Sequence, residues 1–197
     1  MIEVSSTKAF TNLPCGHCQW FDLEPDGSPG ECSSIHGYDR TVRVTFSGEV
    51  DEYGWIIPFG ELKSVKAFIE YYFDHTTVIP ADDVRIKKIP KSMTSEGGLL
   101  SKLRILPYGV SMEMSSLFVW EHVNQYIYQN TDGRCYVSKV ESIEHERNSA
   151  FIEVDRNTAM HYASTHRVDS HLLLPKNHKW AFKSPKTVLN EINAHGW

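Results

Sequence analysis

The chain lacks the extended features that define several classes of protein. No apolar run in its 197 residues approaches the ~20 residues of a membrane-spanning helix, and it has no internal repeat or low-complexity tract. Long basic runs are also absent and the net charge is −5, which argues against the concentrated positive face that non-specific nucleic-acid binding needs. We therefore expect a protein without a membrane or nucleic-acid partner.

Cysteine is scarce, with four residues in the chain. The first residues, M-I-E-V-S-S-T-K, have no apolar core of the kind that a signal peptide contains. Together these features predict a cytoplasmic protein, in which thiols stay reduced and serve catalysis or metal binding. Cys15 and Cys18 have C-x-x-C spacing, but Cys135 stands alone and no second such pair follows. A separate structural zinc site is therefore not expected.

Apolar residues make up 41% of the chain, which is enough for a domain with a sizeable core. Val42, Val44 and Phe46 alternate with polar residues and predict a half-buried strand. Apolar residues at helical spacing predict amphipathic helices at 60–73 and about 112–128. Other strands are expected at 2–12, 103–106, 134–145 and 149–155, and a loop at 18–31. This order predicts an α+β fold with two helices inside a mostly antiparallel set of strands.

The residues that carry chemistry lie between positions 32 and 75. His36 and Tyr38 are two apart on a predicted strand, so their side chains point to the same face. Cys32 lies four residues before His36, close enough to reach the same pocket through a short turn, and Asp74 and His75 follow as a pair. A thiol, imidazoles and a carboxylate are the groups that metal-assisted acid–base chemistry uses. The cluster therefore favours an enzyme over a structural module.

These motifs resemble those of a known family. The patterns C-x-x-x-H-G from Cys32, G-W-I-I-P-F-G-E-L-K at 54–63 and D-H at 74–75 are similar to those of the 6-carboxytetrahydropterin synthases and the related 6-pyruvoyltetrahydropterin synthases. Segments 109–120, 137–142 and 148–150 fit in the same order, so that the resemblance covers roughly residues 8–155. It implies the tunnelling fold (T-fold), an antiparallel sheet with two helices on one face, whose sheets join across subunits into a barrel.

The resemblance implies that His17 and His36 bind zinc. His36 matches the first histidine of the family's H-G-H motif. His17 lies in C-G-H-C and resembles the histidine of F-x-A-A-H, although Phe10 lies seven residues upstream rather than four. Neutral imidazole suits zinc, and a catalytic zinc typically has three protein ligands and one open position.

The third zinc ligand is an open question, because Tyr38 stands where the family has histidine. A phenol is an uncommon zinc ligand, since its pKa of about 10 must be lowered before it binds. Asp39 follows on the opposite face of a regular strand, and Cys15 and Cys18 flank His17. Three outcomes remain: Tyr38 lines the site without binding the metal, one of these cysteines replaces the histidine, or there is no catalytic metal.

Cys32, Asp74 and His75 match the catalytic residues of the family. The resemblance implies that the Cys32 thiolate acts as a base on a C–H beside a zinc-bound oxygen, with a pKa lowered by the metal and by imidazolium charge. Asp74 can fix the tautomer and basicity of His75. Adjacent residues do not face each other on one chain, so the two need not touch, and the relay is expected where subunits meet.

Three further residues match the substrate-binding positions of the family. Glu141 matches the pterin anchor, because a carboxylate accepts the ring N–H and the exocyclic amine as a bidentate pair. Ser111 and Glu113 lie at the start of the second helix, where Val110 replaces the family's proline. Ser111 keeps a hydroxyl that can form one hydrogen bond. Pro58 replaces the aspartate of the family's W-I-I-D-F block, which affects local structure more than chemistry.

The resemblance implies a zinc-dependent lyase that converts 7,8-dihydroneopterin triphosphate into 6-carboxytetrahydropterin, an early intermediate of 7-deazaguanine (queuosine-type) synthesis. The three-residue gap between Cys32 and His36 favours this product over the pyruvoyl product. The alternative is a pterin- or purine-binding protein that has lost the metal site and catalysis. The departures from the family pattern are those of a divergent copy, which suits a phage or a bacterium.

We expect a homo-oligomer built from trimers, either a trimer or a hexamer, because about four long strands leave sheet edges bare and barrel closure removes them. Residues 1–155 are expected to form the T-fold domain and residues 156–197 an extension packed on it. Five histidines lie in this extension, at spacings that suit neither a helix face nor a strand face, and Ser184-Pro185 predicts a helix start.

Overall fold

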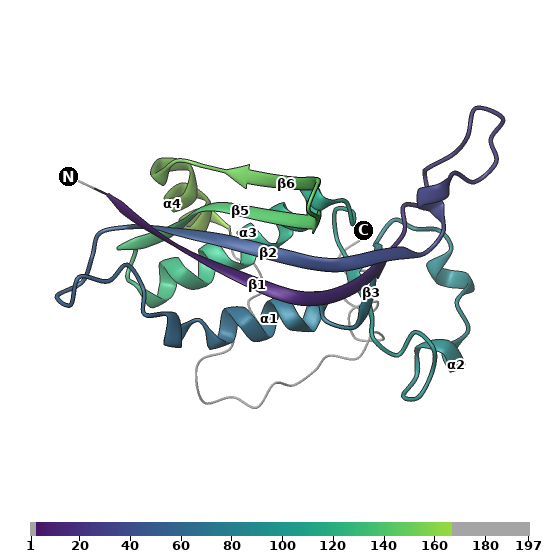
Figure 1. The fold of residues 1–197 in the computed structure, drawn as a ribbon, viewed down its shortest axis with the longest axis horizontal. Helices are drawn as coiled ribbons and strands as arrows, with labels where there is room; N and C mark the ends of the chain where they lie inside the picture. The colour runs from purple at the N-terminus through teal and green to yellow at the C-terminus, as the bar shows by residue number, and fades with distance from the viewer. Residues whose placement is uncertain (1–2, 167–197) are drawn as a thin grey trace.

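Two long strands form the centre of the structure, a computed structural model that describes residues 3–166. β1 (Val4–His17) and β2 (His36–Gly48) pair antiparallel along almost their whole length. The buried residues Val42, Val44 and Phe46 alternate with less buried ones in β2, as the predicted half-buried strand requires. Figure 1 shows both strands curving across the whole molecule.

The sheet has six strands in the order β4-β3-β1-β2-β5-β6. β5 (Cys135–His145) pairs antiparallel with β2, and β6 (Asn148–Glu153) pairs antiparallel with β5. The short strands β3 (Thr76–Pro80) and β4 (Leu103–Leu106) are instead parallel to β1, so the sheet is mixed. The prediction of antiparallel strands is correct for the four longer strands, and the two short ones extend them at one edge.

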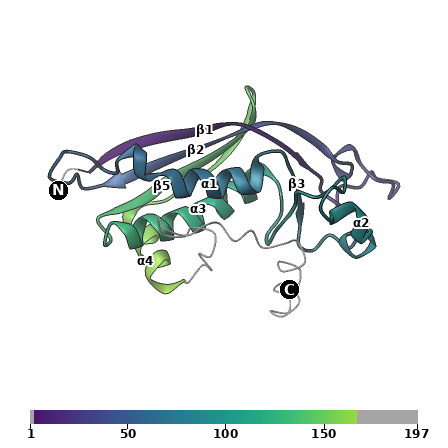
Figure 2. The same ribbon diagram turned by 90° about the horizontal axis from the view of Figure 1, so that it is seen from below.

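Two helices cover one face of the sheet, as predicted. α1 (Lys63–Phe73) and α3 (Met112–Asn130) lie side by side beneath the arch of β1 and β2 in Figure 2. Their apolar residues, among them Val65, Phe68 and Val123, are fully buried. The indole of Trp120 also donates a hydrogen bond of 2.9 Å to the carbonyl of Val137, which fixes α3 against β5. The helical periodicity in the sequence therefore identified the core-facing sides correctly.

Several short elements were not predicted. They are β3, the helices α2 (Lys91–Thr94) and α4 (Arg156–Thr165), and three 3-10 turns, η1 (Glu31–Ser33), η2 (Phe59–Glu61) and η3 (Ile86–Lys88). Asp155 caps α4 by accepting a hydrogen bond from Thr158, and Ala159 is fully buried. α4 therefore continues the folded part past residue 155. Residues 167–197, including the predicted helix start at 184–185, lie outside the described residues.

The first strand also runs further than predicted, to His17 instead of residue 12. It does so through a bulge: Phe10 pairs with Val42, whereas Leu13 pairs with Arg40, so β1 has one extra residue in this interval. Asn12, inside the bulge, has a positive φ of 59°. Because the bulge at Thr11 and Asn12 interrupts the alternation of buried and exposed residues, a search for period-two alternation does not detect that the strand continues.

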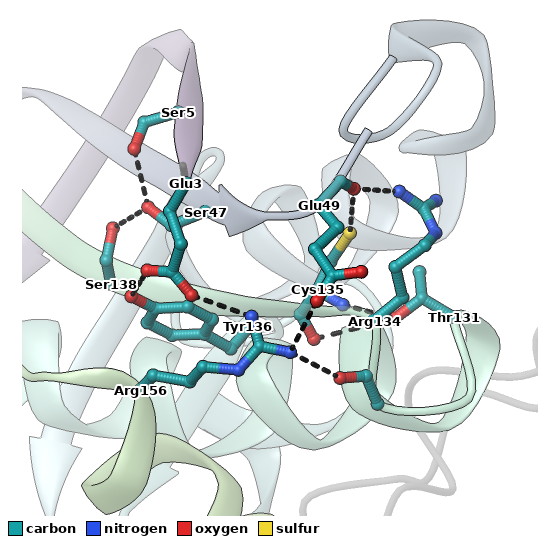
Figure 3. A network of polar contacts seen from close by, with 11 residues as sticks. Glu3, Ser5, Ser47, Glu49, Thr131, Arg134, Cys135, Tyr136, Ser138 and Arg156 are labelled. Atoms are coloured by element: carbon teal, nitrogen blue, oxygen red, sulfur yellow. Dashed lines mark hydrogen bonds and ion pairs between the residues drawn. The ribbon is translucent and has the colours of Figure 1, made fainter. Parts of the chain in front are cut away.

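A polar network links Glu3, just before β1, and Arg156, at the start of α4, to the loop after β2 (Figure 3). Arg156 of α4 donates to Glu3 at 2.7 Å, and the Tyr136 hydroxyl donates to the same carboxylate at 3.0 Å. Arg134 donates to the carbonyls of Glu49, Trp55 and Ile56. The network fixes the loop over 49–56 at the end of β2 that lies away from His36. Within residues 3–166, no helix is long and apolar enough to cross a membrane.

Candidate functional site

Strand pairing brings two histidines together at one end of the sheet. In the register of β1 and β2, His17 lies opposite His36, and Cys15 lies opposite Tyr38. The two imidazole rings are 4.3 Å apart between centroids. His17 is buried, with 3% of its surface exposed, on the face of the sheet that also carries the helices. The predicted pairing of His17 and His36 is therefore present in the geometry of a single chain.

The hydrogen bonds of these rings leave nitrogen lone pairs unused. Nδ1 of His36 lies 2.8 Å from the carbonyl of Ser34, and a carbonyl only accepts, so Nδ1 carries the proton and Nε2 is free to bind. Metal-binding histidines commonly make such a bond to a backbone carbonyl. His17 Nδ1 is buried without a hydrogen-bond partner. Burial, then the charges of Arg40 and His36, lower the pKa of His17 to about 4, so its ring is neutral at pH 7.

These two rings suit zinc, but a third ligand is not assembled beside them. No three histidine, cysteine, aspartate or glutamate side chains among residues 3–166 lie close enough to hold a metal ion. Cys15 packs in the main core. Cys18 belongs to a second apolar cluster and receives a hydrogen bond of 3.2 Å from Arg85. The Tyr38 ring stands edge-on to His36, 6.5 Å away between centroids. Within residues 3–166, the two histidines could therefore bind a metal ion, but no third protein ligand is positioned beside them.

Three residues near this pair were missed in the sequence. Glu144 at the end of β5 places a carboxylate oxygen 3.8 Å from Nε2 of His17, and the ring of His145 lies 5.5 Å from that of Tyr38. Both reach the site because β5 pairs with β2, a register that no local pattern encodes. Arg40 is 2% exposed. Its place among alternating apolar residues was a signal that could have revealed a buried charge.

Arg40 is held by few partners for a buried cation. One guanidinium nitrogen donates to Ser115 of α3 at 3.0 Å, and the group lies 4.9 Å from the ring of Phe73. The other terminal nitrogen is buried without a partner. Burial lowers the pKa of Arg40, whereas Cys15 and Glu144 raise it. A permanent positive charge therefore lies beside His17 and opposes a cation there.

Cys32 lies on the turn η1 that precedes β2, and it is the exposed one of the four cysteines. Its backbone N–H donates to Asp22 at 2.9 Å, and its carbonyl accepts from Gln19 at 2.7 Å. Partial burial and the nearby carboxylates of Asp22, Glu144 and Glu31 raise the pKa of its thiol. The protein groups alone therefore do not lower the pKa of Cys32 as expected, because the charged groups around this thiol are negative.

Asp74 and His75 touch each other directly. Nδ1 of His75 lies 2.6 Å from the Asp74 carboxylate, at the C-terminal end of α1. This contact between neighbours was not expected, and it forms because His75 has a positive φ of 54°, which turns its side chain back. The carboxylate accepts a hydrogen bond from Nδ1–H, which leaves the lone pair of the ring on Nε2. The His75 side chain is 71% exposed, so this nitrogen can reach a second molecule.

Glu141 lies far from this group of residues. It pairs with Arg43 across β5 and β2 at 2.6 Å and accepts a hydrogen bond of 3.0 Å from Ser149. Arg43 is exposed, whereas its neighbours in β2 are buried, so Glu141 is on the sheet face opposite to His36. Arg43 is also seven residues along β2 from His36, roughly 23 Å at the rise of a strand. One chain therefore does not bring Glu141 to Cys32.

Ser111 and Glu113 form the start of α3. The Ser111 side chain caps the helix by accepting a hydrogen bond of 3.3 Å from the backbone of Met114. Glu113 is exposed in the first turn, where a negative charge suits the helix dipole. The contact of Ser115 with Arg40 places this helix end beside β2. Ser111 thus has a structural role in this chain, whatever it contributes to binding.

The sequence is similar to known proteins of one family. The family model described as 6-pyruvoyl tetrahydropterin synthase matches residues 6–155. Among curated relatives, a 6-carboxy-5,6,7,8-tetrahydropterin synthase from Rickettsia typhi is 29% identical over 72 residues, which is 36% of this chain and 52% of the relative. The Bacillus subtilis protein of the same name is 35% identical over 60 residues, 30% of this chain and 39% of the relative. The chain thus spans about half the length of these relatives or less.

Solved structures resemble the fold more completely. An uncharacterized protein, WS1659 from Wolinella succinogenes, has a TM-score of 0.65 at 19% identity, and the match covers 79% of this chain and all of that one. The 6-pyruvoyltetrahydropterin synthase of Plasmodium vivax has a TM-score of 0.56 at 16% identity, covering 79% of this chain and 99% of that one. At these identities the likeness shows the fold alone.

The curved sheet with two helices on one face is the T-fold. Because the family model covers most of the folded part, the chain belongs to the 6-pyruvoyl tetrahydropterin synthase family.

Proposed function

We propose that the protein is a cytoplasmic lyase that converts 7,8-dihydroneopterin triphosphate into 6-carboxytetrahydropterin, in the synthesis of 7-deazaguanine (queuosine-type) precursors. The observation that carries this proposal is the exposed thiol of Cys32, on the turn that leads into the paired histidines, in a chain of this family. The curated relatives support the carboxy product, because those named above are 6-carboxy-5,6,7,8-tetrahydropterin synthases.

The residues of the chain supply most of the proposed chemistry. Cys32 would remove a proton from the substrate side chain, and His75 would exchange protons through Nε2 while Asp74 holds its Nδ1 proton. Glu141 would accept the ring N–H and exocyclic amine of the pterin in place of its bonds to Arg43 and Ser149. Release of triphosphate and a two-carbon fragment would complete the reaction.

We propose zinc as the cofactor, held by Nε2 of His36 and a ring nitrogen of His17. It would polarise the side-chain oxygens of the substrate. The lone pairs described above support both histidines as ligands. Tyr38 would line the pocket, and Glu113 and Ser111 would border the substrate from the start of α3.

The proposed active site lies between subunits. Glu141 pairs with Arg43, seven residues along β2 from His36, and lies on the sheet face opposite to His36, whereas Cys32 precedes His36 on η1, so a pocket that includes both Glu141 and Cys32 needs two chains. The edges support such an assembly: β6 ends the sheet on one side, and β3 pairs with Cys15–His17 of β1, so that within residues 3–166 the first part of β1 has no strand partner on that side. We propose a trimer-based homo-oligomer, with residues 1–155 as its T-fold domain and residues 156–197 as an extension on it.

The test is direct incubation with 7,8-dihydroneopterin triphosphate and zinc, with the product identified by mass spectrometry. The expected product is 6-carboxytetrahydropterin, and Cys32→Ala is expected to abolish its formation while the folded oligomer and pterin binding are kept. No turnover by the folded, zinc-supplemented protein would overturn the proposal.

A second function is favoured by two residues beside the histidine pair. Tyr38 replaces a zinc ligand and Arg40 brings a positive charge to the same place, so the chain has features of a binding protein that has lost catalysis. Such a protein would bind a pterin or a purine and release it unchanged. Tight pterin binding without zinc and without turnover would establish this function and refute the lyase.

A further inference from the structure

Two charged residues after β3 form an ion pair, of which Arg85 contacts the turn that carries Cys32. Asp83 has only 2% of its side chain exposed, and it faces the guanidinium of Arg85. Nε of Arg85 donates to the two carboxylate oxygens at 2.9 and 3.1 Å, and one terminal nitrogen donates at 2.8 Å. The backbone N–H of Arg85 donates to the same carboxylate at 2.8 Å. The guanidinium is therefore fixed in its plane by Asp83.

Arg85 makes two further contacts, one to the turn and one to Cys18 Sγ at 3.2 Å. One terminal nitrogen donates to the carbonyl of Ser33 at 2.7 Å, across 52 positions of sequence. Ser33 is the residue directly after Cys32, and it is buried, with its hydroxyl bonded to the carbonyl of Gly30 at 2.7 Å. The Asp83–Arg85 pair thus holds the Ser33–Ser34 peptide group, one residue past Cys32, by a charge-assisted hydrogen bond.

Packing alone does not hold this turn. Ser33 and Arg85 line a cavity of about 550 Å³ whose other walls are largely apolar, including Ile79, Ile86 and Leu103. A turn that borders a hollow has few van der Waals contacts on that side. The direction of the Cys32 side chain therefore depends on polar contacts: those of its own backbone with Asp22 and Gln19, and that of Ser33 with Arg85.

We propose that Asp83 and Arg85 are positioning residues for Cys32. They fix the carbonyl of Ser33 and with it the direction in which the thiol points, without touching the substrate. The inference rests on the proposed function of Cys32 in proton transfer. A displacement of about 1 Å in a reacting group can cost on the order of 100-fold in rate, so a loose turn is expected to lower kcat and to leave KM nearly unchanged.

The test uses Arg85→Lys in the full-length oligomer. Lysine keeps a positive charge beside Asp83 but lacks the planar fork that serves the carboxylate and the Ser33 carbonyl together. We expect kcat to fall about 10–100-fold with KM within about threefold. Hydrogen exchange of the amides in 30–35 should speed up on the order of tenfold, because one charge-assisted bond is lost, whereas exchange in 41–47 should not change.

The matched control is Arg134→Lys. Arg134 also donates to loop carbonyls, at the opposite end of β2 (Figure 3). It should keep the kcat of the unmodified protein. The double variant Asp83→Leu with Arg85→Met removes both charges at once, which avoids an unpaired buried carboxylate. It should keep the melting temperature and still show the loss of kcat, which separates positioning from stability.

Two results would overturn the proposal: an Arg85→Lys protein with unaltered kcat, or unaltered exchange in 30–35. Failure of the proposed function is a different result. In that case Cys32→Ala retains full turnover, or the unmodified protein has none, while Arg85→Lys still speeds exchange at the turn.

Discussion

Tyr38 stands beside a histidine pair that is otherwise suited to zinc. It lies on the same strand face as His36, whereas Asp39 points to the other face. We predict that Tyr38→His raises zinc affinity on the order of 100-fold, since each ligand of a structural zinc site contributes roughly 3 kcal/mol. Titration against a zinc-sensitive dye measures the change.

Asp39→His is the control for that substitution, because it adds an imidazole to the opposite face. Its zinc affinity should match that of the unmodified protein. Equal gains in both variants would show that the site is not where the strand register puts it. His36→Ala should release the metal without unfolding, as elemental analysis and circular dichroism would show.

Glu141 is predicted to anchor the pterin. Glu141→Ala should weaken pterin binding about 30–150-fold, because a bidentate contact to a carboxylate contributes on the order of 2–3 kcal/mol. Stability should change little, since its partner Arg43 is 46% exposed and can return to water. Isothermal titration with a pterin measures the effect. Glu153→Ala, which removes another β-strand carboxylate paired with a cation, should bind normally. Equal losses in the two variants would contradict the anchor.

Single residues of the site differ in how far the sequence reveals them. Cys32, His36 and Asp74-His75 form short motifs, and the structure places Cys32 on the turn η1 and His36 at the start of the strand that follows it. Glu144 could not be predicted, because it reaches His17 only through the pairing of β5 with β2. The Asp74–His75 contact was missed because the sequence does not reveal a positive φ at a histidine.

Among the elements, the contact between α3 and α4 contains a buried acid. Glu121 accepts a hydrogen bond of 2.7 Å from the hydroxyl of Tyr162, and burial raises the pKa of Glu121 above its ordinary 4.5. In the window from 4.5 to this raised pKa, the folded state binds more protons than the unfolded state. Stability from this group is therefore present at low pH and is lost as pH rises through the window.

The variant Glu121→Gln keeps an acceptor for Tyr162 and removes the charge. We predict that it does not lose stability as pH rises through this window, so that at pH 7 it is at least as stable as the unmodified protein. Urea unfolding from pH 4 to 7 measures this. Glu70→Gln, which alters a more exposed carboxylate on α1, should follow the unmodified protein. Parallel curves for Glu121→Gln and the unmodified protein would contradict the prediction.

The long elements, whose apolar residues repeat regularly over many positions, were predictable, and the short elements were not. α1 and α3 begin and end within a few residues of the predicted helices, because their buried faces repeat every three to four residues. β3 has five residues, three of them from a continuous apolar run that fits several structures. α2 has four residues and no period to detect. The parallel edge of the sheet could not be predicted for this reason.

The whole molecule is expected to function as an oligomer. Cys32→Ala protein should be inactive and Glu141→Ala protein nearly so at a substrate concentration far below its weakened affinity, and mixing them after dissociation should restore part of the activity. Hybrid interfaces would combine an intact thiol from one chain with an intact carboxylate from another. The activity of the mixture is the measurement, with each variant reassembled alone as the control. A fully active monomer of 22.6 kDa in light scattering would contradict a shared site.

The extra residue in β1 reverses which positions, odd or even, face the core in the part of the strand that follows it. Phe10 and His17 are an odd number of positions apart, yet both are buried on one face because the bulge absorbs one residue. An odd insertion or deletion here would turn His17 outward, whereas an even one would leave it in place. Related chains can therefore differ in length in this stretch only by an even number of residues if the histidine is to stay on the same face. A sequence alignment that ignores the bulge assigns the histidine to the wrong face of the sheet.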